Sequence, residues 1–191
     1  MGRWQPDGHG RLQQAALALF ERDGYAATTV TAIAGRAGLT ERTFYRHFPD
    51  KRDVLFGDED RLEAAVVAAV AAAPEQADAA TALALGLRAL AAELGTDHRR
   101  AHRRARVIAS EPELAERELG KLNAWSDAIV ACLSARGMST VGARLAAELA
   151  MAVFGNAFHR WTDSASASDL SALVDKTLDD AALLLRPQGY R

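Results

Sequence analysis

The sequence predicts an all-α protein with two parts, an N-terminal three-helix domain that contains a helix-turn-helix and a C-terminal helical bundle. Alanine, the residue with the highest helix propensity, is abundant, and strand-forming residues are scarce. Apolar residues recur every three or four positions along most of the chain, which is the spacing of one helix face. A hydrophobic fraction of 49% also suffices for a buried core.

The first expected helix spans about residues 10–23 and ends at Asp23-Gly24. Two short helices follow within residues 28–48, with Thr29 and Thr40 placed to cap them. A threonine hydroxyl at this position accepts a hydrogen bond from an otherwise unpaired amide of the first turn. Gly38, between the two helices, can adopt the positive φ that a tight reversal needs. Two short helices joined in this way form a helix-turn-helix.

The second helix of this motif buries Phe44 and Phe48 and presents polar side chains on its other side. Guanidinium, hydroxyl, phenol and imidazole groups hydrogen-bond with phosphates and with base edges in the major groove. An ordinary helical hairpin with a solvated face is the alternative. The two caps, the glycine turn and the basic second helix together favour DNA binding. The outward side chains are Arg42, Thr43, Tyr45, Arg46 and His47.

The distribution of charge agrees with this interpretation, although the net charge of the chain is −2. Residues 36–52 contain five basic and two acidic side chains, which leaves a local charge of +3. A dimer would present this basic surface twice, so its affinity for DNA would depend on the local rather than the total charge.

The remaining helices are expected to form the bundle. One helix from about Lys51 to Ala72 links the two parts, and Pro74 ends it. Further helices are expected near residues 76–94, 97–109, 111–135 and 139–162, followed by a last helix capped by Ser168 or Asp169. The domain boundary is therefore placed after residue 50, with residues 1–50 as the helix-turn-helix domain and residues 51–191 as the bundle.

Residues 11–56 resemble the DNA-binding domain of the TetR family of bacterial transcriptional regulators. Residues 16–20, 24–30, 33–34, 37–40, 43–48 and 51–55 match its pattern in order. The resemblance implies a homodimeric repressor whose second domain senses a small molecule. It implies that phosphates contact Thr29, Thr40, Tyr45, His47 and Lys51. It also implies that Thr31, Arg42, Thr43 and Arg46 can reach bases.

The segment 97–108 is the second informative feature. On a helix, Arg99, Arg103 and Arg106 lie on one side, and His98 and His102 lie one turn apart at the edge of the apolar side. One interpretation is a solvated cationic face with two interface histidines, and the other is an arginine row that binds an anionic ligand. The two histidines could also bind a metal, but only Asp97 is near as a third ligand, so no metal site is expected.

A narrower resemblance favours the ligand interpretation. Residues 103–114, with Trp125 further along, resemble the sensor domain of the mycofactocin-system regulator subgroup. This implies an acyl-coenzyme A ligand, whose apolar tail would lie inside the bundle with its anionic end at the arginines. The residues expected to line the site are Leu62, Val66, His102, Arg103, Arg106, Trp125, Ile129, Phe154 and Phe158. No cofactor is expected.

The sequence therefore predicts a cytoplasmic, dimeric repressor that an amphipathic ligand releases from a near-palindromic operator. Cys132 is the single cysteine, so no disulfide framework is possible within the chain. No uninterrupted apolar run reaches the ~18 residues of a spanning helix, so no membrane partner is expected. The dimer is expected to form through the last two long helices, at Leu173, Thr177 and Ala181 and at Ala146, Ala150 and Ala157.

Two other functions stay open at this point. A helical enzyme or metal-binding protein could carry a fortuitous helix-turn-helix, but the chain has neither a glycine-rich phosphate loop nor a Gly-x-Ser-x-Gly turn. A DNA-binding architectural or partner-binding protein would need no sensor domain. The Leu- and aromatic-rich region 83–161, larger than a dimer surface needs, disfavours it.

Overall fold

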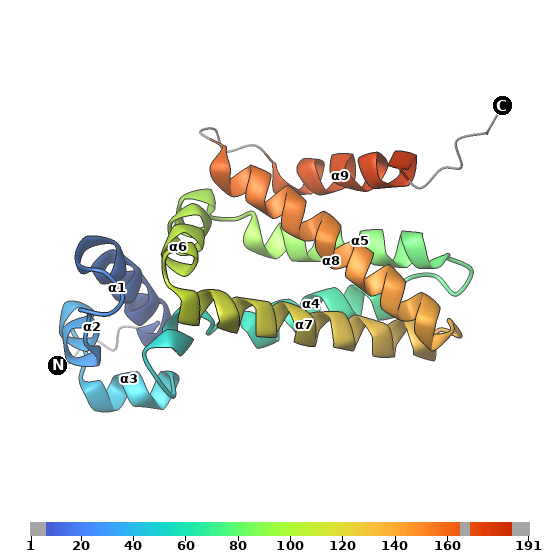
Figure 1. Cartoon of the computed structure of the whole chain (residues 1–191). Helices are drawn as coiled ribbons and strands as arrows, with labels where there is room; N and C mark the ends of the chain where they lie inside the picture. Colours follow the sequence, from blue (N-terminus) through green and yellow to red (C-terminus); the bar gives the residue numbers. More distant parts are fainter. Residues whose placement is uncertain (1–6, 165–168, 185–191) are drawn as a thin grey trace. The chain divides into compact units, whose positions relative to one another are not determined.

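The computed structural model describes residues 7–164 and 169–184, and every regular element in these ranges is helical (Figure 1). The predicted all-α class is confirmed. In chain order, the elements are α1 (Gly8–Asp23), α2 (Val30–Arg36), α3 (Glu41–His47), the 3₁₀ helix η1 (Arg52–Leu55), α4 (Glu59–Ala71), α5 (Ala79–Leu94), α6 (His98–Ser110), α7 (Pro112–Ala135), α8 (Thr140–Asp163) and α9 (Leu170–Leu184).

The chain forms two compact units that differ from the division placed after residue 50. The first unit holds the chain up to Glu59 together with Arg103–Glu118, and the second holds Asp60–His102 and the chain from Leu119 onward. The physical reason is a shared core, because Val107, Ile108 and Leu114 are buried in the same hydrophobic cluster as α1, α2 and α3. Helices α4, α6 and α7 each begin in one unit and end in the other.

The helix-turn-helix lies in the first unit with the expected local geometry. Thr29 Oγ1 accepts a hydrogen bond from Ala32 N at 3.1 Å, and Thr40 Oγ1 accepts one from Thr43 N at 3.2 Å. Gly38 reverses the chain with φ +66°. Phe44 and Phe48, on α3, are almost completely buried. Both predicted N-caps are therefore confirmed.

The expected single helix over residues 51–72 is wrong, because the chain breaks there into η1, a turn and α4. Asp50 Oδ1 accepts hydrogen bonds from Arg52 N at 2.8 Å and Asp53 N at 3.2 Å, which starts the short 3₁₀ helix. The turn then brings Gly57 against Phe48 and His9 within the first unit. A Cβ at this residue would lie 2.6 Å from Phe48 Cε1, so only glycine allows this approach.

The second unit is a bundle in which α8 packs on α9 and both pack on α5 (Figure 1). Helix α4 crosses α5 where Gly86 leaves room for Val66 and Val70. Polar contacts join the helices at the surface, such as the ion pair between Arg88 Nε and Asp175 Oδ1 at 2.7 Å. Asp169 Oδ1 accepts from Ser171 N at the start of α9, whereas Ser168 lies outside the described residues.

Helix α8 has two different faces. Ala150 and Ala157 are buried within the unit, so the expectation that they would face a second subunit is wrong. Val141, Leu145 and Leu149 instead lie on the exposed side, with 73%, 63% and 42% of their surface accessible. By length and mean hydropathy alone α8 could cross a membrane, a test that core helices of soluble proteins also pass. Its burial against α5 and α9 accounts for the apolar residues of the other face.

Candidate nucleic-acid interface

The outward face of α3 carries the polar groups that the sequence analysis placed there. Arg42, Tyr45 and Arg46 are exposed, and Tyr45 shows 55% of its surface although it is aromatic. Phe44 lies on the opposite side of the helix and is fully buried. The packing of Phe44 thus fixes the rotation of α3 and directs the polar face to solvent.

Short polar contacts organise the start of α3. The hydroxyl of Thr31, on α2, donates to the carboxylate of Glu41, the first residue of α3. The hydroxyls of Thr40 and Thr43 lie 3.0 Å apart. These contacts bring Thr31, Thr40 and Thr43 to one exposed end of the motif, as their predicted roles require.

Lys51 has a structural role that the sequence did not indicate. Its Nζ donates to Tyr25 O at 2.8 Å and to Thr28 O at 3.0 Å, and it lies 4.1 Å from the centre of the Tyr25 ring. Because an ammonium group has three N–H donors, one is left for a phosphate. Burial, with a smaller contribution from Glu113 and Asp50, raises the pKa of Tyr25 to about 12, so its phenol stays neutral beneath this lysine.

His47 differs from the other outward residues of α3 because it is half-buried. Its ring lies near His9 and packs on Phe48, with centroid distances of 6.1 Å and 6.3 Å. Burial, followed by the charge of Arg46, lowers the pKa of His47. The surroundings of the imidazole therefore favour its neutral form, which can still offer a phosphate a hydrogen bond.

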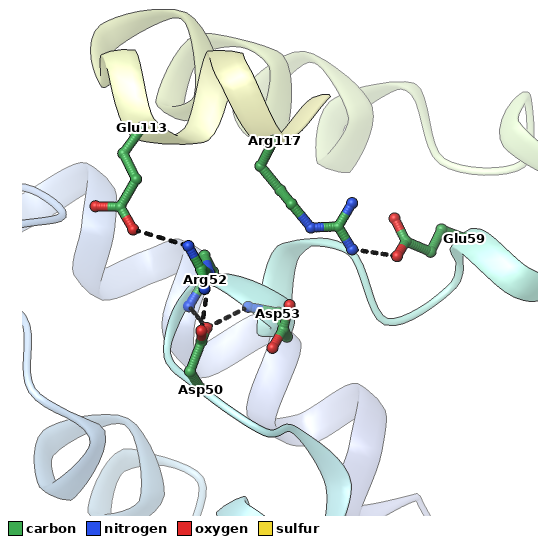
Figure 2. A network of polar contacts seen from close by, with 6 residues as sticks. All are labelled: Asp50, Arg52, Asp53, Glu59, Glu113 and Arg117. Carbon is green, nitrogen blue, oxygen red and sulfur yellow. Dashed lines mark hydrogen bonds and ion pairs between the residues drawn. The ribbon is translucent and has the colours of Figure 1, made fainter. Parts of the chain in front are cut away.

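A polar network joins the start of α7 to residues 50–59, which follow α3, as Figure 2 shows. Arg52 binds Asp50 at 2.8 Å and Glu113 at 3.4 Å, and Arg117 forms an ion pair with Glu59. Burial, and next the neighbouring charge of Asp50, raises the pKa of Asp53. The sequence analysis missed this network because its partners are about 60 residues apart in the chain.

Phe56 lies at the centre of the same contact. The guanidinium groups of Arg104 and Arg117 lie 5.0 Å and 4.9 Å from the centre of its ring. Arg104 also donates to Leu55 O at 2.8 Å and binds Glu118 at 2.8 Å. The end of α6 and the start of α7 are therefore fixed to the segment that follows α3.

The expected ligand-lining residues fall into two groups. Seven lie in the second unit, where Trp125 and Ile129 are buried in one cluster with the other apolar members of the set. His102 belongs to this group, but its Nδ1 is 2.5 Å from Thr162 O, and His98 Nε2 is 2.8 Å from Trp161 O. The histidines thus pair with carbonyls at the end of α8, which matches the interpretation as interface histidines. The remaining members of the seven are Leu62, Val66, Phe154 and Phe158.

The two arginines of the set lie in the first unit instead. Arg103 forms an ion pair with Glu21 on α1, and Arg106 is exposed. Lys121 is a cation that the sequence analysis did not name. It is buried in the second unit, with its Nζ 4.8 Å from the Trp125 ring. In the described ranges, no three His, Cys, Asp or Glu side chains are grouped closely enough to hold a metal ion.

Comparisons with known proteins agree with this geometry. The sequence pattern of bacterial regulatory proteins of the tetR family matches residues 12–56, from α1 to the end of η1. The HTH-type transcriptional regulator TcmR of Streptomyces glaucescens is 38% identical over 64 residues. That stretch is 34% of this chain and 28% of TcmR, so the similarity spans less than a third of the relative's length.

Solved structures share the fold over nearly the whole chain. FadR from Bacillus subtilis, solved with stearoyl-CoA, has a TM-score of 0.64 at 21% identity and covers 90% of this chain and 96% of its own. SmeT, the repressor of the Stenotrophomonas maltophilia multidrug efflux pump SmeDEF, has a TM-score of 0.63 at 21% identity and covers 96% and 93%. The narrower resemblance to the mycofactocin-system subgroup stays a prediction. Residues 12–56 therefore form a domain of the tetR family of bacterial regulatory proteins.

Proposed function

We propose that the protein is a dimeric, cytoplasmic transcriptional repressor that binds a near-palindromic operator and leaves it when a small amphipathic ligand binds. The observation that carries the proposal is the outward face of α3, on which Arg42, Tyr45 and Arg46 are exposed. Thr29 and Thr40 cap α2 and α3, the two helices of the motif. These groups match the donors and acceptors that read a major groove and its phosphates.

The proposed DNA contacts form two groups, one to backbone phosphates and one to bases. Thr29, Thr40, Tyr45, His47 and Lys51 bind backbone phosphates, and Thr31, Arg42, Thr43 and Arg46 reach the bases. Arg42 and Arg46 are exposed and carry planar guanidinium groups, which bind guanine through two hydrogen bonds. Two copies of the motif, held by a symmetric dimer, require two half-sites related by the same symmetry.

The ligand site lies in the second unit, around the cluster that contains Trp125, Ile129 and Phe154. Small-molecule sites are mostly apolar with few polar groups, and Lys121 beside Trp125 supplies such a group. An acyl-coenzyme A fits the amphipathic class. FadR from Thermus thermophilus, which shares the fold at 21% identity, was solved with lauroyl-CoA, and SmeT was solved with triclosan. We expect the protein to have no enzymatic activity.

A gel-shift titration tests the proposal. Fragments from the protein's own promoter region are titrated at one stated salt concentration, first without a ligand and then with stearoyl-coenzyme A. Tight binding to one fragment that the ligand weakens is the expected result. Binding that is equal for every fragment would indicate an architectural protein, and binding that no amphipathic anion changes would remove the sensor role.

A further inference from the structure

A shallow depression lies between α1 and the end of α2 in the first unit. It has a volume of about 420 Å³ and is lined by Arg11, Gln14, Ala15, Arg36, Ala37 and Gly38. Its polar lining consists of two guanidinium groups and one amide, and no acidic side chain lines it. Such a set of donors suits an oxyanion.

Arg11 is held in place by the turn of the helix-turn-helix. Its Nη2 donates to Ala37 O, a carbonyl at the C-terminal end of α2 that would otherwise repel an anion. A Cβ at Gly38 would lie 2.9 Å from the same nitrogen, so the glycine leaves room for the guanidinium. A guanidinium has five N–H donors, so this hydrogen bond leaves others directed elsewhere.

Arg36, in the last turn of α2, adds the second positive charge and is exposed. Asp23 is the acidic residue whose charge interacts with Arg36, but its carboxylate is bound to Arg22 at 2.7 Å. The positive charge of the depression is therefore only weakly compensated.

We propose that this depression binds a phosphate of the operator backbone and so extends the proposed DNA contact to α1 and the C-terminal end of α2. The inference rests on the proposed function. The depression is open rather than enclosed, which suits a phosphate that is presented by a polymer. Gly38, which lines the depression, is exposed, as are Thr40 and Arg42 a few residues further along the chain. Gly35 and Gly38 have no side chain to hold DNA away, and the space beside Gly35 is open.

The salt dependence of operator binding tests this assignment. Each phosphate contact contributes about 0.9 to the slope of log affinity against log salt. Arg36→Gln in a dimer should therefore lower the slope by up to about 1.8, with base preferences unchanged. Between 50 and 200 mM salt, the wild type should lose about tenfold more affinity than this variant. Arg36→Lys should keep most of the slope, because the charge remains.

Two controls separate the possible outcomes. Arg88→Gln on α5 changes the net charge equally and should leave the slope at the wild-type value. Thermal unfolding of each variant shows whether the fold is kept. An Arg36→Gln slope equal to that of the wild type overturns the proposal, as does a changed order of preferred bases, which would make Arg36 a base-reading residue.

The source of the phosphate is tested without DNA. Inorganic phosphate is titrated into wild type and Arg36→Gln and followed by amide chemical shifts around Gly38. Weak, non-saturating shifts are expected. Saturable binding that Arg36→Gln abolishes, together with an unchanged DNA slope, would assign the site to a free anion and reject the proposal. If the wild type binds no DNA fragment at all, the proposed function itself is rejected. If the wild type binds its operator and Arg36→Gln has the same salt slope, only the inference about the depression is rejected.

Discussion

Lys51 joins the segment after α3 to the loop before α2 through one ammonium group. Its two hydrogen bonds to Tyr25 O and Thr28 O fix the loop before α2, and the third N–H is left for DNA. Lys51→Ala should therefore weaken all operator sequences alike and also reduce the stability of the domain by about 1–3 kcal/mol, since hydrogen bonds to a charged group are lost. Urea unfolding and binding to a set of mutated operators measure the two effects.

Tyr45→Phe is the matched comparison. The Tyr45 hydroxyl is exposed, and no hydrogen bond within the described part of the chain involves it. This variant should weaken binding to every operator without changing the unfolding midpoint. If Lys51→Ala weakens binding and leaves the unfolding free energy at the wild-type value, the structural role of Lys51 is wrong.

Replacement of Arg42 should have the opposite effects to Lys51→Ala, changing the base preference and not the stability. The Arg42 side chain is exposed on α3, so removal should cost little stability. Arg42→Ala should cost about 1–3 kcal/mol of operator affinity and relax the preference at one base position if the guanidinium binds a guanine in a bidentate manner. Affinities across an operator set with every single base change give the answer. An unchanged base preference would contradict the base-reading role.

Contacts between residues close in the sequence could be predicted, and contacts between residues far apart in the sequence could not. The caps at Thr29 and Thr40 and the turn at Gly38 were predictable because each depends on neighbours within a few positions. The pairing of Arg103 with Glu21 joins residues 82 positions apart, so no local pattern encodes it. The assignment of Arg103 to a ligand followed from its helix face and from the narrower family resemblance, and neither reveals its pairing with Glu21.

At the scale of elements, the helices themselves were largely predictable and their packing was not. The stretch 51–72 has an apolar helical pattern, yet it breaks at Gly57, where Phe48 and His9 from elsewhere in the chain approach the backbone. Similarly, residues 103–118 belong to two helices that the sequence assigns to the bundle, but their buried side chains complete the core of the first unit.

The crossing of α4 and α5 gives a prediction at this scale. A Cβ at Gly86 would lie 2.7 Å from Val70 Cγ2 and 3.1 Å from Val66 Cγ2. Gly86→Ala should therefore destabilise the protein by about 1–3 kcal/mol through overpacking, as measured by urea unfolding. Gly120→Ala on α7 is the control, since the added methyl meets nothing within 4 Å. It should instead stabilise the helix by up to about 1 kcal/mol, and a stabilising Gly86→Ala would contradict the close crossing.

At the scale of the whole molecule, the exposed face of α8 predicts how the dimer forms. Val141, Leu145 and Leu149 recur every four residues, which makes a continuous apolar stripe on a helix. Leu145→Glu should shift the protein from dimer toward monomer in sedimentation experiments at micromolar concentration. Leu119→Glu replaces a leucine of α7 with the same 63% exposure and should leave the dimer intact. Equal effects of the two variants would show that the α8 stripe is not the contact.

The proposed response to ligand concerns the whole chain, because the residues proposed to bind the ligand and those proposed to bind DNA belong to different units. The chain passes between the units three times, within α4, α6 and α7. On the side of the first unit, the contacts of Phe56 with Arg104 and Arg117 fix two of these helices to the segment that follows α3. We therefore expect a change in the ends of α6 and α7 that belong to the second unit to be transmitted along these continuous helices.

A ligand can shift the DNA-binding equilibrium only by binding one conformation better, and a coupling of about 1–3 kcal/mol is typical. Stearoyl-coenzyme A should therefore lower operator affinity by about 5- to 150-fold. Phe158→Ala and Lys121→Met should both reduce this factor while keeping the affinity measured without ligand. Phe158 contacts the apolar cluster, with its ring 6.0 Å from Phe154, so it tests the site of the tail. Lys121→Met keeps the buried chain but removes its charge, so it tests the site of the anionic end. If Phe158→Ala alone reduces the response, the anionic end lies elsewhere. If neither variant changes the response, the ligand site lies outside this cluster.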